Sequence, residues 1–309
     1  MKKILFIFGI IAVIVAAIVA LTTYKQNTNT NQISVVTTLF PLYDFAQNIG
    51  QDKVEVFLLL PPGVEAHSFE PKPGDIVKIS EAEVFVYTGK FMEPWAEDIV
   101  KGIANKKLIV VDASKGINMI PGVFHDADEP AGSLDPHIWL DFDNAKIMVD
   151  NITRALAEKN PSNAQYYHQN ADEYKSALSN LDNEYKTALS KCQRKEIIYG
   201  GHYAFGYLAR RYGIEHIAAQ GLSPDAEPTA QDLVQLVEQI KAKNIQYIFY
   251  EELTSPKIAE TLSRETNTQM LLLNAAHNLT KEDFENQATF LAIMKANLEN
   301  LKIGLQCTE

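Results

Sequence analysis

The chain has 309 residues, of which 46% are hydrophobic and 22% charged, so it can bury at least one sizeable core and has room for two. Its formal net charge of −11 excludes the strongly basic surface that is typical of nucleic-acid-binding proteins. The composition therefore indicates a globular protein that binds no nucleic acid.

The N-terminal segment, residues 1–32, has the pattern of an export signal. Two lysines precede an uncharged apolar run at 4–21, which is long for a cleaved signal and about long enough to span a bilayer. We expect a retained membrane anchor followed by a flexible spacer at 26–32, with cleavage after Ala17 as the alternative. No cysteine precedes Cys192, so we expect no lipid-modified N-terminus. The protein is expected on the outer face of the cytoplasmic membrane or in the periplasm.

Short apolar runs alternate with helical stretches in residues 33–160 and again in residues 193–309. In the first segment these runs predict strands at 33–37, 54–60, 84–87 and 108–111. In the second they predict strands at 196–199, 215–219, 247–250 and 270–273. Alternation of strands and helices is typical of a parallel sheet covered on both faces. The sequence therefore predicts an α/β protein of two similar lobes.

Residues 161–192 lie between these lobes and form one predicted helix. Tyrosines and leucines recur at helical spacing from Tyr166 to Leu189 without an internal Gly or Pro, and Pro161 suits a helix start. A helix of about thirty residues would be about 45 Å long. Two helices broken near 179–183 are the alternative. A single linking helix would act as a stiff hinge, so we expect only small relative motion of the lobes.

Four of the seven histidines follow predicted strands, in loops where parallel sheets place ligand sites. Each lobe supplies two of them, in positions that we expect to match: His67, His137, His202 and His277. An isolated loop histidine is usually a surface or hydrogen-bonding residue, so the inference rests on the combination. Four neutral imidazoles suit zinc and complete a tetrahedral shell. The sequence therefore predicts one metal site in the cleft between the lobes.

Local sequence around two of these histidines indicates how the rings are fixed. Asp135 and Asp141 flank His137 and are expected to accept a hydrogen bond from its ring N–H. The glycine pair 200–201 precedes His202 and is expected to let the backbone bend sharply after the strand. Both features favour ordered imidazoles over freely rotating ones.

The remaining histidines and the two cysteines are expected to lie outside this site. His125 lies in an acidic loop and could collect metal weakly, with a solvated loop as the alternative. His168, on the linking helix, is expected to be structural, and His216 to be a core residue within a strand. Cys192 and Cys307 could form a disulfide in an oxidising compartment, but two free thiols are equally compatible with the sequence.

At these residues the chain resembles the solute-binding proteins of zinc and manganese ABC importers, the metal-binding lipoprotein family, over residues 33–305. Three segments carry the resemblance: the first histidine loop at 61–73, Asp-Pro-His-Ile-Trp at 135–139, and the Gly-Gly-His segment at 200–208. Two more, at 221–229 and 250–257, are family-like and are expected to shape the site. The resemblance implies a monomer that captures Zn²⁺, with Mn²⁺ as the alternative, and delivers it to the importer's membrane permease without chemical reaction.

Two departures from the family pattern bear on the metal. In the family the third ligand tends to be His in zinc importers and Glu in manganese importers, so His202 points to zinc. The fourth position usually carries an acidic residue, whereas this chain has His277, with water at that position as the alternative. A neutral fourth ligand disfavours Mn²⁺ further. The His-rich loop of many zinc members is reduced here to the stretch around His125.

Two other functions remain open at this point. A zinc hydrolase would hold its ion with three histidines and a water, with Glu65 or Glu252 as the base. The sequence contains neither H-E-x-x-H nor G-x-S-x-G, which are motifs of known hydrolases. A surface adhesin would use the two-lobed body to bind host matrix.

Overall fold

The computed structural model describes residues 32–122, 132–224 and 228–308. The helices and strands within them belong to one unit, residues 33–309. The expected anchor and spacer, the cleavage site at Ala17 and the acidic loop around His125 fall outside the described residues. Among the described residues, no helix combines the length and the apolar character that crossing a membrane requires.

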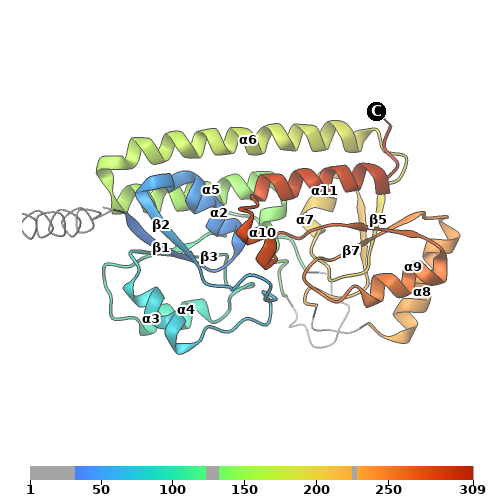
Figure 1. The fold of residues 1–309 in the computed structure, drawn as a ribbon, viewed down its shortest axis with the longest axis horizontal. Helices are drawn as coiled ribbons and strands as arrows, with labels where there is room; N and C mark the ends of the chain where they lie inside the picture. Colours follow the sequence, from blue (N-terminus) through green and yellow to red (C-terminus); the bar gives the residue numbers. More distant parts are fainter. Residues whose placement is uncertain (1–31, 123–131, 225–227, 309) are drawn as a thin grey trace, which may run out of the picture. The chain divides into compact units, whose positions relative to one another are not determined.

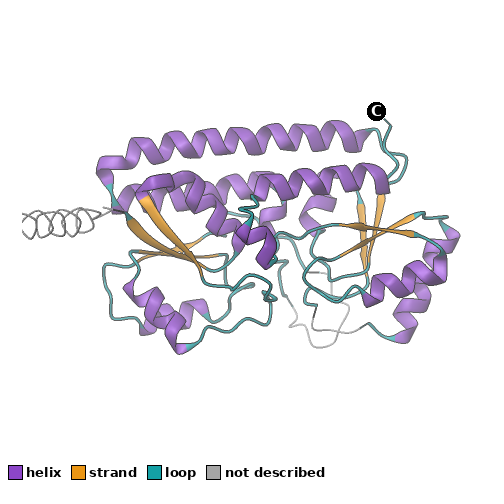
Figure 2. Ribbon diagram, viewed as in Figure 1, coloured by secondary structure: helices purple, strands orange, loops and turns teal. Residues whose placement is uncertain are grey.

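Two four-stranded parallel sheets form two lobes, as Figures 1 and 2 show. The sheets have the orders β2-β1-β3-β4 and β6-β5-β7-β8, so their topology is the same. The strands are β1 Ile33–Thr37, β2 Val54–Leu58, β3 Val84–Tyr87, β4 Ile109–Asp112, β5 Glu196–Tyr199, β6 Glu215–Ala218, β7 Tyr247–Tyr250 and β8 Gln269–Leu272. The predicted α/β fold with two parallel sheets is confirmed, and every predicted strand forms with small shifts at its ends.

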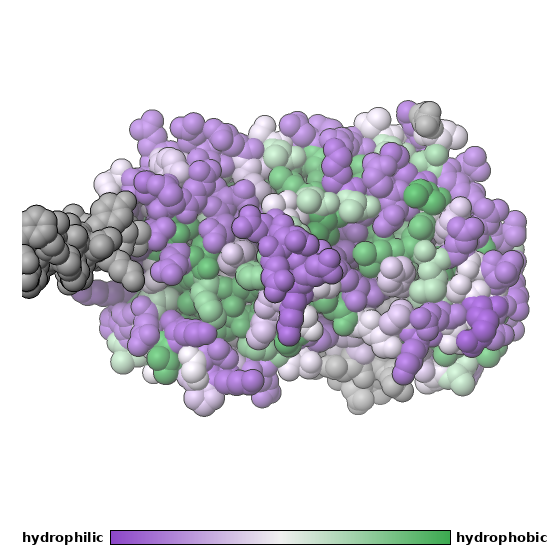
Figure 3. Space-filling model, in the orientation of Figure 1, coloured by the Kyte–Doolittle hydropathy of each residue, from purple (hydrophilic) through white to green (hydrophobic). Residues whose placement is uncertain are grey.

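Helices cover both faces of each sheet, as the pattern predicts. One layer contains α2 Phe40–Gly50, α5 Phe142–Lys159, α6 Ala164–Ser190, α7 Gly206–Tyr212 and α11 Phe290–Gly304. The opposite layer contains α3 Pro73–Glu81, α4 Ala96–Gly102, α8 Ala230–Ala242 and α9 Lys257–Thr266. Short elements complete the chain: η1 Gln51–Lys53, η2 Ile138–Leu140, η3 Pro161–Asn163 and α10 Lys281–Glu285. Hydrophilic residues dominate the face drawn in Figure 3, including the surface over α10.

The linking segment is one unbroken helix, α6, which follows the 3-10 turn at Pro161–Asn163. Its buried side is a stripe that recurs every three or four residues: Tyr167, Ala171, Tyr174, Leu178, Leu181, Tyr185 and Leu189. With no Gly or Pro to interrupt it, this stripe packs along both lobes over about 40 Å. The expectation of a single helix is confirmed, and the alternative of two broken helices is wrong.

The lobes share one apolar core. Val35 of β1 and Ile197 of β5 belong to the same buried cluster, which also contains residues of α2, α5, α6, α7 and α11. Two smaller clusters lie under the outer helices, one beneath α3 and α4 and one beneath α8 and α9. Separating the lobes would expose the shared core to water, so the packing opposes large lobe motion.

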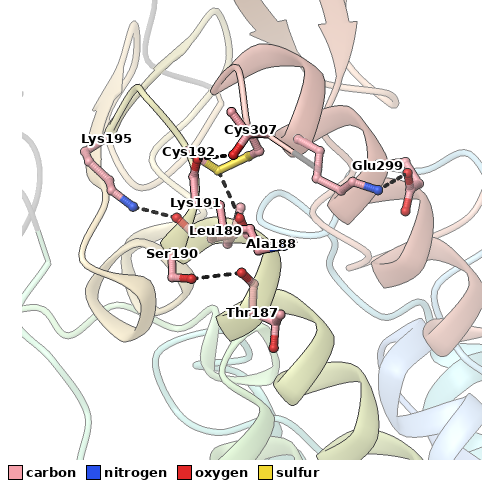
Figure 4. Close-up of a disulfide and its surroundings, with 11 residues drawn as sticks. Thr187, Ala188, Leu189, Ser190, Lys191, Cys192, Lys195, Glu299 and Cys307 are labelled. Carbon is pink, nitrogen blue, oxygen red and sulfur yellow. Dashed lines mark hydrogen bonds and ion pairs between the residues drawn. A yellow bond between two sulfur atoms is a disulfide. The ribbon is translucent and has the colours of Figure 1, made fainter.

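A disulfide joins the end of α6 to the end of the chain, as Figure 4 shows. Cys192 lies just beyond α6 and Cys307 just beyond α11. The bond therefore closes a loop of the chain that contains the strands and helices of the second lobe. Nearby, the Lys195 ammonium donates to the carbonyl oxygen of Leu189 at 2.5 Å. Of the two possibilities that the sequence left open for the cysteines, the structure has the paired one.

A buried ion pair ties α7 to the linking helix. Arg211 donates from Nη2 and Nε to the two carboxylate oxygens of Asp182, at 2.7 and 2.8 Å, and Tyr212 adds a third bond at 2.9 Å. Burial alone would raise the pKa of Asp182, but the bonds from Arg211 and Lys186 outweigh it and hold the pKa well below its usual range. The carboxylate therefore stabilises the fold in its ionised form.

We expect Asp182→Asn to lower the free energy of unfolding by about 1–3 kcal/mol at pH 7, because it removes the buried charge that accepts from Arg211. Arg211 keeps its ion pairs with Asp141 and Asp143, which limit the loss. Since the folded-state pKa lies below the unfolded one, this stabilisation is complete above about pH 4 and is lost as the pH falls further. Urea unfolding at pH 7 and pH 3 should therefore show a difference between wild type and variant that shrinks in acid. Asp172→Asn, at an exposed position of α6, is the control and should cost little. An equal difference at both pH values would contradict the assignment.

In the first sheet, the crevice at the carboxyl ends of the central strands is filled by Glu93. Its buried carboxylate accepts from the hydroxyl of Thr38, which follows β1, and from the backbone N–H groups of Thr88 and Gly89 at 3.2 and 3.0 Å, which follow β3. Burial raises the pKa of Glu93 to about 7, although these bonds oppose the shift. This position, where open α/β sheets usually bind ligands, is thus occupied by the protein's own side chain.

Candidate metal centre

The structure brings together the imidazoles of His67, His137 and His202. Nε2 of His137 lies 3.2 Å from Nε2 of His67 and 3.1 Å from Nε2 of His202. Among the described residues, this trio is the group whose nitrogens could share one metal ion. Two nitrogens bound to a tetrahedral zinc at 2.0–2.1 Å lie about 3.3 Å apart. Both Nε2 separations from His137 thus match the spacing that one zinc ion requires, and the ligand nitrogens of the trio all lie within 4.8 Å of one another.

His277 lies beside this trio but farther out. Its ring centroid is 5.8 Å from that of His202 and 6.4 Å from that of His67, whereas the centroids within the trio are 5.0–5.1 Å apart. The side chain is buried, and neither ring nitrogen has a hydrogen-bond partner within the described part of the chain. Buried polar groups are almost always paired, so an orphaned imidazole at this place suits a ligand that completes its bonding with an ion.

Two carboxylates orient two of the rings. Asp135 lies 2.8 Å from Nδ1 of His137, and Glu251 lies 2.8 Å from Nδ1 of His202. A carboxylate at Nδ1 keeps the proton there and leaves the Nε2 lone pair facing the other rings. The predicted role of Asp135 is thus confirmed. Asp141 was wrongly assigned a similar role: it caps α5 by accepting from the backbone N–H groups of residues 143 and 144.

Glu251 was not predicted to hold a ring, although its segment was expected to shape the site. The available signal was its position directly after β7, which lies next to β5 in the second sheet. The carboxyl ends of neighbouring parallel strands meet at one sheet edge, so Glu251 and His202 had to be close.

The glycines before His202 serve close packing. A Cβ at Gly200 would come within 2.6 Å of Ala259, and one at Gly201 within 2.5 Å of the Glu251 carboxylate. The chain bends at both glycines, as expected, although neither has a positive φ. Gly201 also lets the backbone approach Glu251, which brings His202 within reach of that carboxylate.

The electrostatics keep most of these rings neutral. Burial lowers the pKa of His67 to about 3 and that of His137 well below its usual value, and neighbouring imidazoles add to both shifts. Burial also lowers the pKa of His277. For His202 burial acts in the same direction, but the charge and hydrogen bond of Glu251 outweigh it and raise the pKa. At neutral pH the rings of His67, His137 and His277 are therefore unprotonated, as metal ligands must be.

The expected match between the two lobes holds for one pair of histidines. His137 follows β4 and His277 follows β8, which are equivalent strands of the two sheets. His67 follows β2, whereas His202 follows β5, whose equivalent in the first sheet is β1. The expectation of matching positions is wrong for this second pair, because in the first lobe the place after β1 faces Glu93.

The other described histidines do not belong to this group of imidazoles. His168 is exposed on α6. His216 is buried in β6, with its ring centroid 4.5 Å from that of Tyr203 and close to Tyr199 and Phe205. The position of His216 agrees with the core role expected from sequence, whereas His168 is a surface residue, and its expected structural role stays a prediction.

Residues 35–304 match the family model described as zinc-uptake complex component A, periplasmic. The chain belongs to this family. It is 38% identical over 282 residues to the Bacillus subtilis high-affinity zinc uptake system protein ZnuA, covering 89% of this chain and 88% of that protein. It is 34% identical to the Streptococcus pyogenes zinc-binding protein AdcA, of whose length the alignment covers 61%. The family consists of metal-binding solute-binding proteins, so the predicted family membership is confirmed.

A solved structure gives the same fold. The Zn(II)-bound ZnuA-like domain of Streptococcus pneumoniae AdcA superposes with a TM-score of 0.77 at 34% identity. The superposition covers 89% of this chain and 99% of that domain. Both the two-lobed architecture and the long helix are therefore features of this family.

Proposed function

We propose that the protein captures Zn²⁺ outside the cytoplasm and delivers it to the permease of an ABC importer. The observation that carries this proposal is the convergence of three imidazoles from three separate loops, with the Nε2 atoms of His67 and His202 each at zinc spacing from that of His137. Relatives named as a zinc uptake protein and zinc-binding proteins support the same cargo. Mn²⁺ fits the site less well, because it prefers harder oxygen ligands to neutral imidazoles.

We assign the four imidazoles as the cargo's ligands, with His67, His137 and His202 as the inner set and His277 as the fourth. His67 is half-buried while the other three rings are buried, so the ion would enter at His67. A shell of four imidazoles leaves no coordination position for an activated water, and the proposal therefore includes no chemical reaction. We further propose that residues 33–160 and 193–309 are the two metal-binding lobes and that residues 161–192 link them. The protein is proposed to be a monomer that is tethered to the membrane through residues 1–32.

The proposal is tested by metal content after expression in unsupplemented medium. We expect one zinc per chain in the wild-type protein and none in the double variant His67→Ala/His202→Ala, because a single remaining inner imidazole binds zinc weakly. His168→Ala/His216→Ala removes the same number of histidines elsewhere and should keep its zinc. A wild-type protein without metal, or a double variant that retains it, would overturn the proposal.

A further inference from the structure

The loop that follows β8 belongs to the second lobe by sequence but is hydrogen-bonded to the first. We call residues 274–280 the crossing loop. Three first-lobe groups donate to its carbonyls: the Trp139 indole at 2.8 Å, and the backbone N–H groups of Phe40 and Gly63 at 3.2 and 2.7 Å. The acceptors are the carbonyl oxygens of Ala275, His277 and Leu279.

Asn278 adds a side-chain connection to these backbone bonds. Its amide nitrogen donates to the carbonyl oxygens of Pro61 and Val64, each at 2.8 Å, and its Oδ1 accepts from the N–H of Leu279 at 2.8 Å. The side chain is 1% exposed, so water does not compete for these bonds. Pro61 and Val64 begin the loop that carries His67. One buried amide thus connects the loops of two proposed ligands.

The crossing loop is held in a conformation that it would not adopt alone. Ala276 has φ 57°, in the left-handed region that is unfavourable for a residue with a Cβ. Its N–H donates to Oδ1 of Asn274 at 2.7 Å, and its own lobe holds Asn274 through Asn297 of α11. Surrounding bonds therefore fix this strained turn next to His277.

The loop that carries His202 is bonded differently. The backbone hydrogen bonds found for residues 200–204 in the described structure all stay within the second lobe, for example from Tyr203 N–H to Gly221 O at 2.6 Å. Its ring is held by Glu251, also in the second lobe. The ring of His202 contacts the imidazoles of His67 and His137 in the first lobe. The hydrogen bonds that join the following segment to the first lobe lie in α7, where the Tyr207 hydroxyl donates to the Asp135 carbonyl and accepts from the N–H of Ile120.

We propose that Asn278 is a positioning residue for metal capture, which fixes the His67 loop to the crossing loop. As a consequence, His67, His137 and His277 lie on one hydrogen-bonded unit, and His202 alone is carried by the rest of the second lobe. The ion is then released when His202 moves away together with Glu251. The two histidines of the first lobe stay next to His277, so release does not require the lobes to separate with two ligands each. This inference rests on the proposed function and specifies which ligand moves.

Zinc dissociation tests the role of Asn278. Asn278→Asp keeps the size and the Oδ1 acceptor but replaces both donated bonds by repulsion between a carboxylate and two carbonyl oxygens. We expect zinc loss to a chelator in stopped flow to become about tenfold faster, as disruption of buried hydrogen bonds predicts. Asn151→Asp is the matched control, since Asn151 of α5 is also buried and its amide also donates to two carbonyl oxygens, those of Ala113 and Lys115, outside the crossing loop. It should lower the melting temperature similarly and leave zinc dissociation within about twofold of wild type.

Equal dissociation rates in Asn278→Asp and Asn151→Asp, or an unchanged rate in Asn278→Asp, would overturn the positioning role. If Asn278→Asp does not fold, hydrogen exchange on the wild-type protein decides the question. Amides of 61–67 and of the crossing loop should stay protected without zinc, while those of 200–204 gain protection when zinc binds. Loss of protection in the crossing loop on zinc removal would overturn the inference, whereas wild-type protein that binds no zinc would overturn only the proposed function.

Discussion

Replacing His137 by alanine is expected to weaken zinc binding by more than about a hundredfold. His137 is the central member of the trio, since its Nε2 lies within 3.2 Å of both His67 and His202. Loss of an outer partner of a metal ligand alone typically costs 10- to 100-fold in affinity, and loss of the ligand itself should cost more. Competition with a chelator of known affinity measures the change.

The same variant separates a binding role from a structural one. A ligand that binds only the folded protein raises its melting temperature, so zinc should stabilise the wild type and fail to stabilise His137→Ala. The matched control is His168→Ala, which removes an exposed imidazole from α6 and should behave as wild type in both measurements. Zinc affinity within tenfold of wild type in His137→Ala would show that the central imidazole is no ligand.

Replacing Trp139 by alanine is expected to cost about 3–5 kcal/mol of folding free energy, among the largest effects of any single change in this chain. Trp139 is completely buried in the core that the lobes share, and its indole N–H donates to Ala275 O in the crossing loop. The substitution creates a cavity and leaves that carbonyl without its partner. Urea unfolding of the metal-free protein measures the loss without a contribution from zinc.

Two variants define how this loss arises. Trp139→Phe fills much of the space but lacks the donor, so it should cost about 1–3 kcal/mol. The other tryptophan of the chain is half-buried at the edge of the smaller cluster under α3 and α4, and Trp95→Ala should cost clearly less than Trp139→Ala. Equal losses for Trp95→Ala and Trp139→Ala would argue against the central place assigned to the shared core.

Much of the fold could be predicted because its signals are local. Strands such as β3 are short apolar runs between turns, and the buried stripe of α6 repeats at the helical period. The candidate ligands could be found because parallel strands place their following loops at one edge. His137 and His277 were located by this rule, although the match assumed for His67 and His202 failed because they follow strands that are not equivalent in the two sheets, β2 and β5.

What could not be predicted depends on contacts between distant parts of the chain. The bond between Cys192 and Cys307 requires α6 and α11 to end side by side, which no local pattern encodes. The bonds of Asn278 to the first lobe join residues more than two hundred positions apart. An asparagine in a loop usually indicates a turn, so its sequence context pointed to local bonding.

Glu93 explains why the two halves, although they have the same architecture, contribute differently to the candidate metal centre. Three donors of the first half bond this carboxylate, so the Glu93 side chain fills the crevice at the carboxyl ends of the central strands β1 and β3. At the corresponding place in the other half, Glu251 instead holds the ring of His202. In the first half the candidate ligands therefore follow the outer strands β2 and β4, and the two halves contribute unequally to one candidate metal centre.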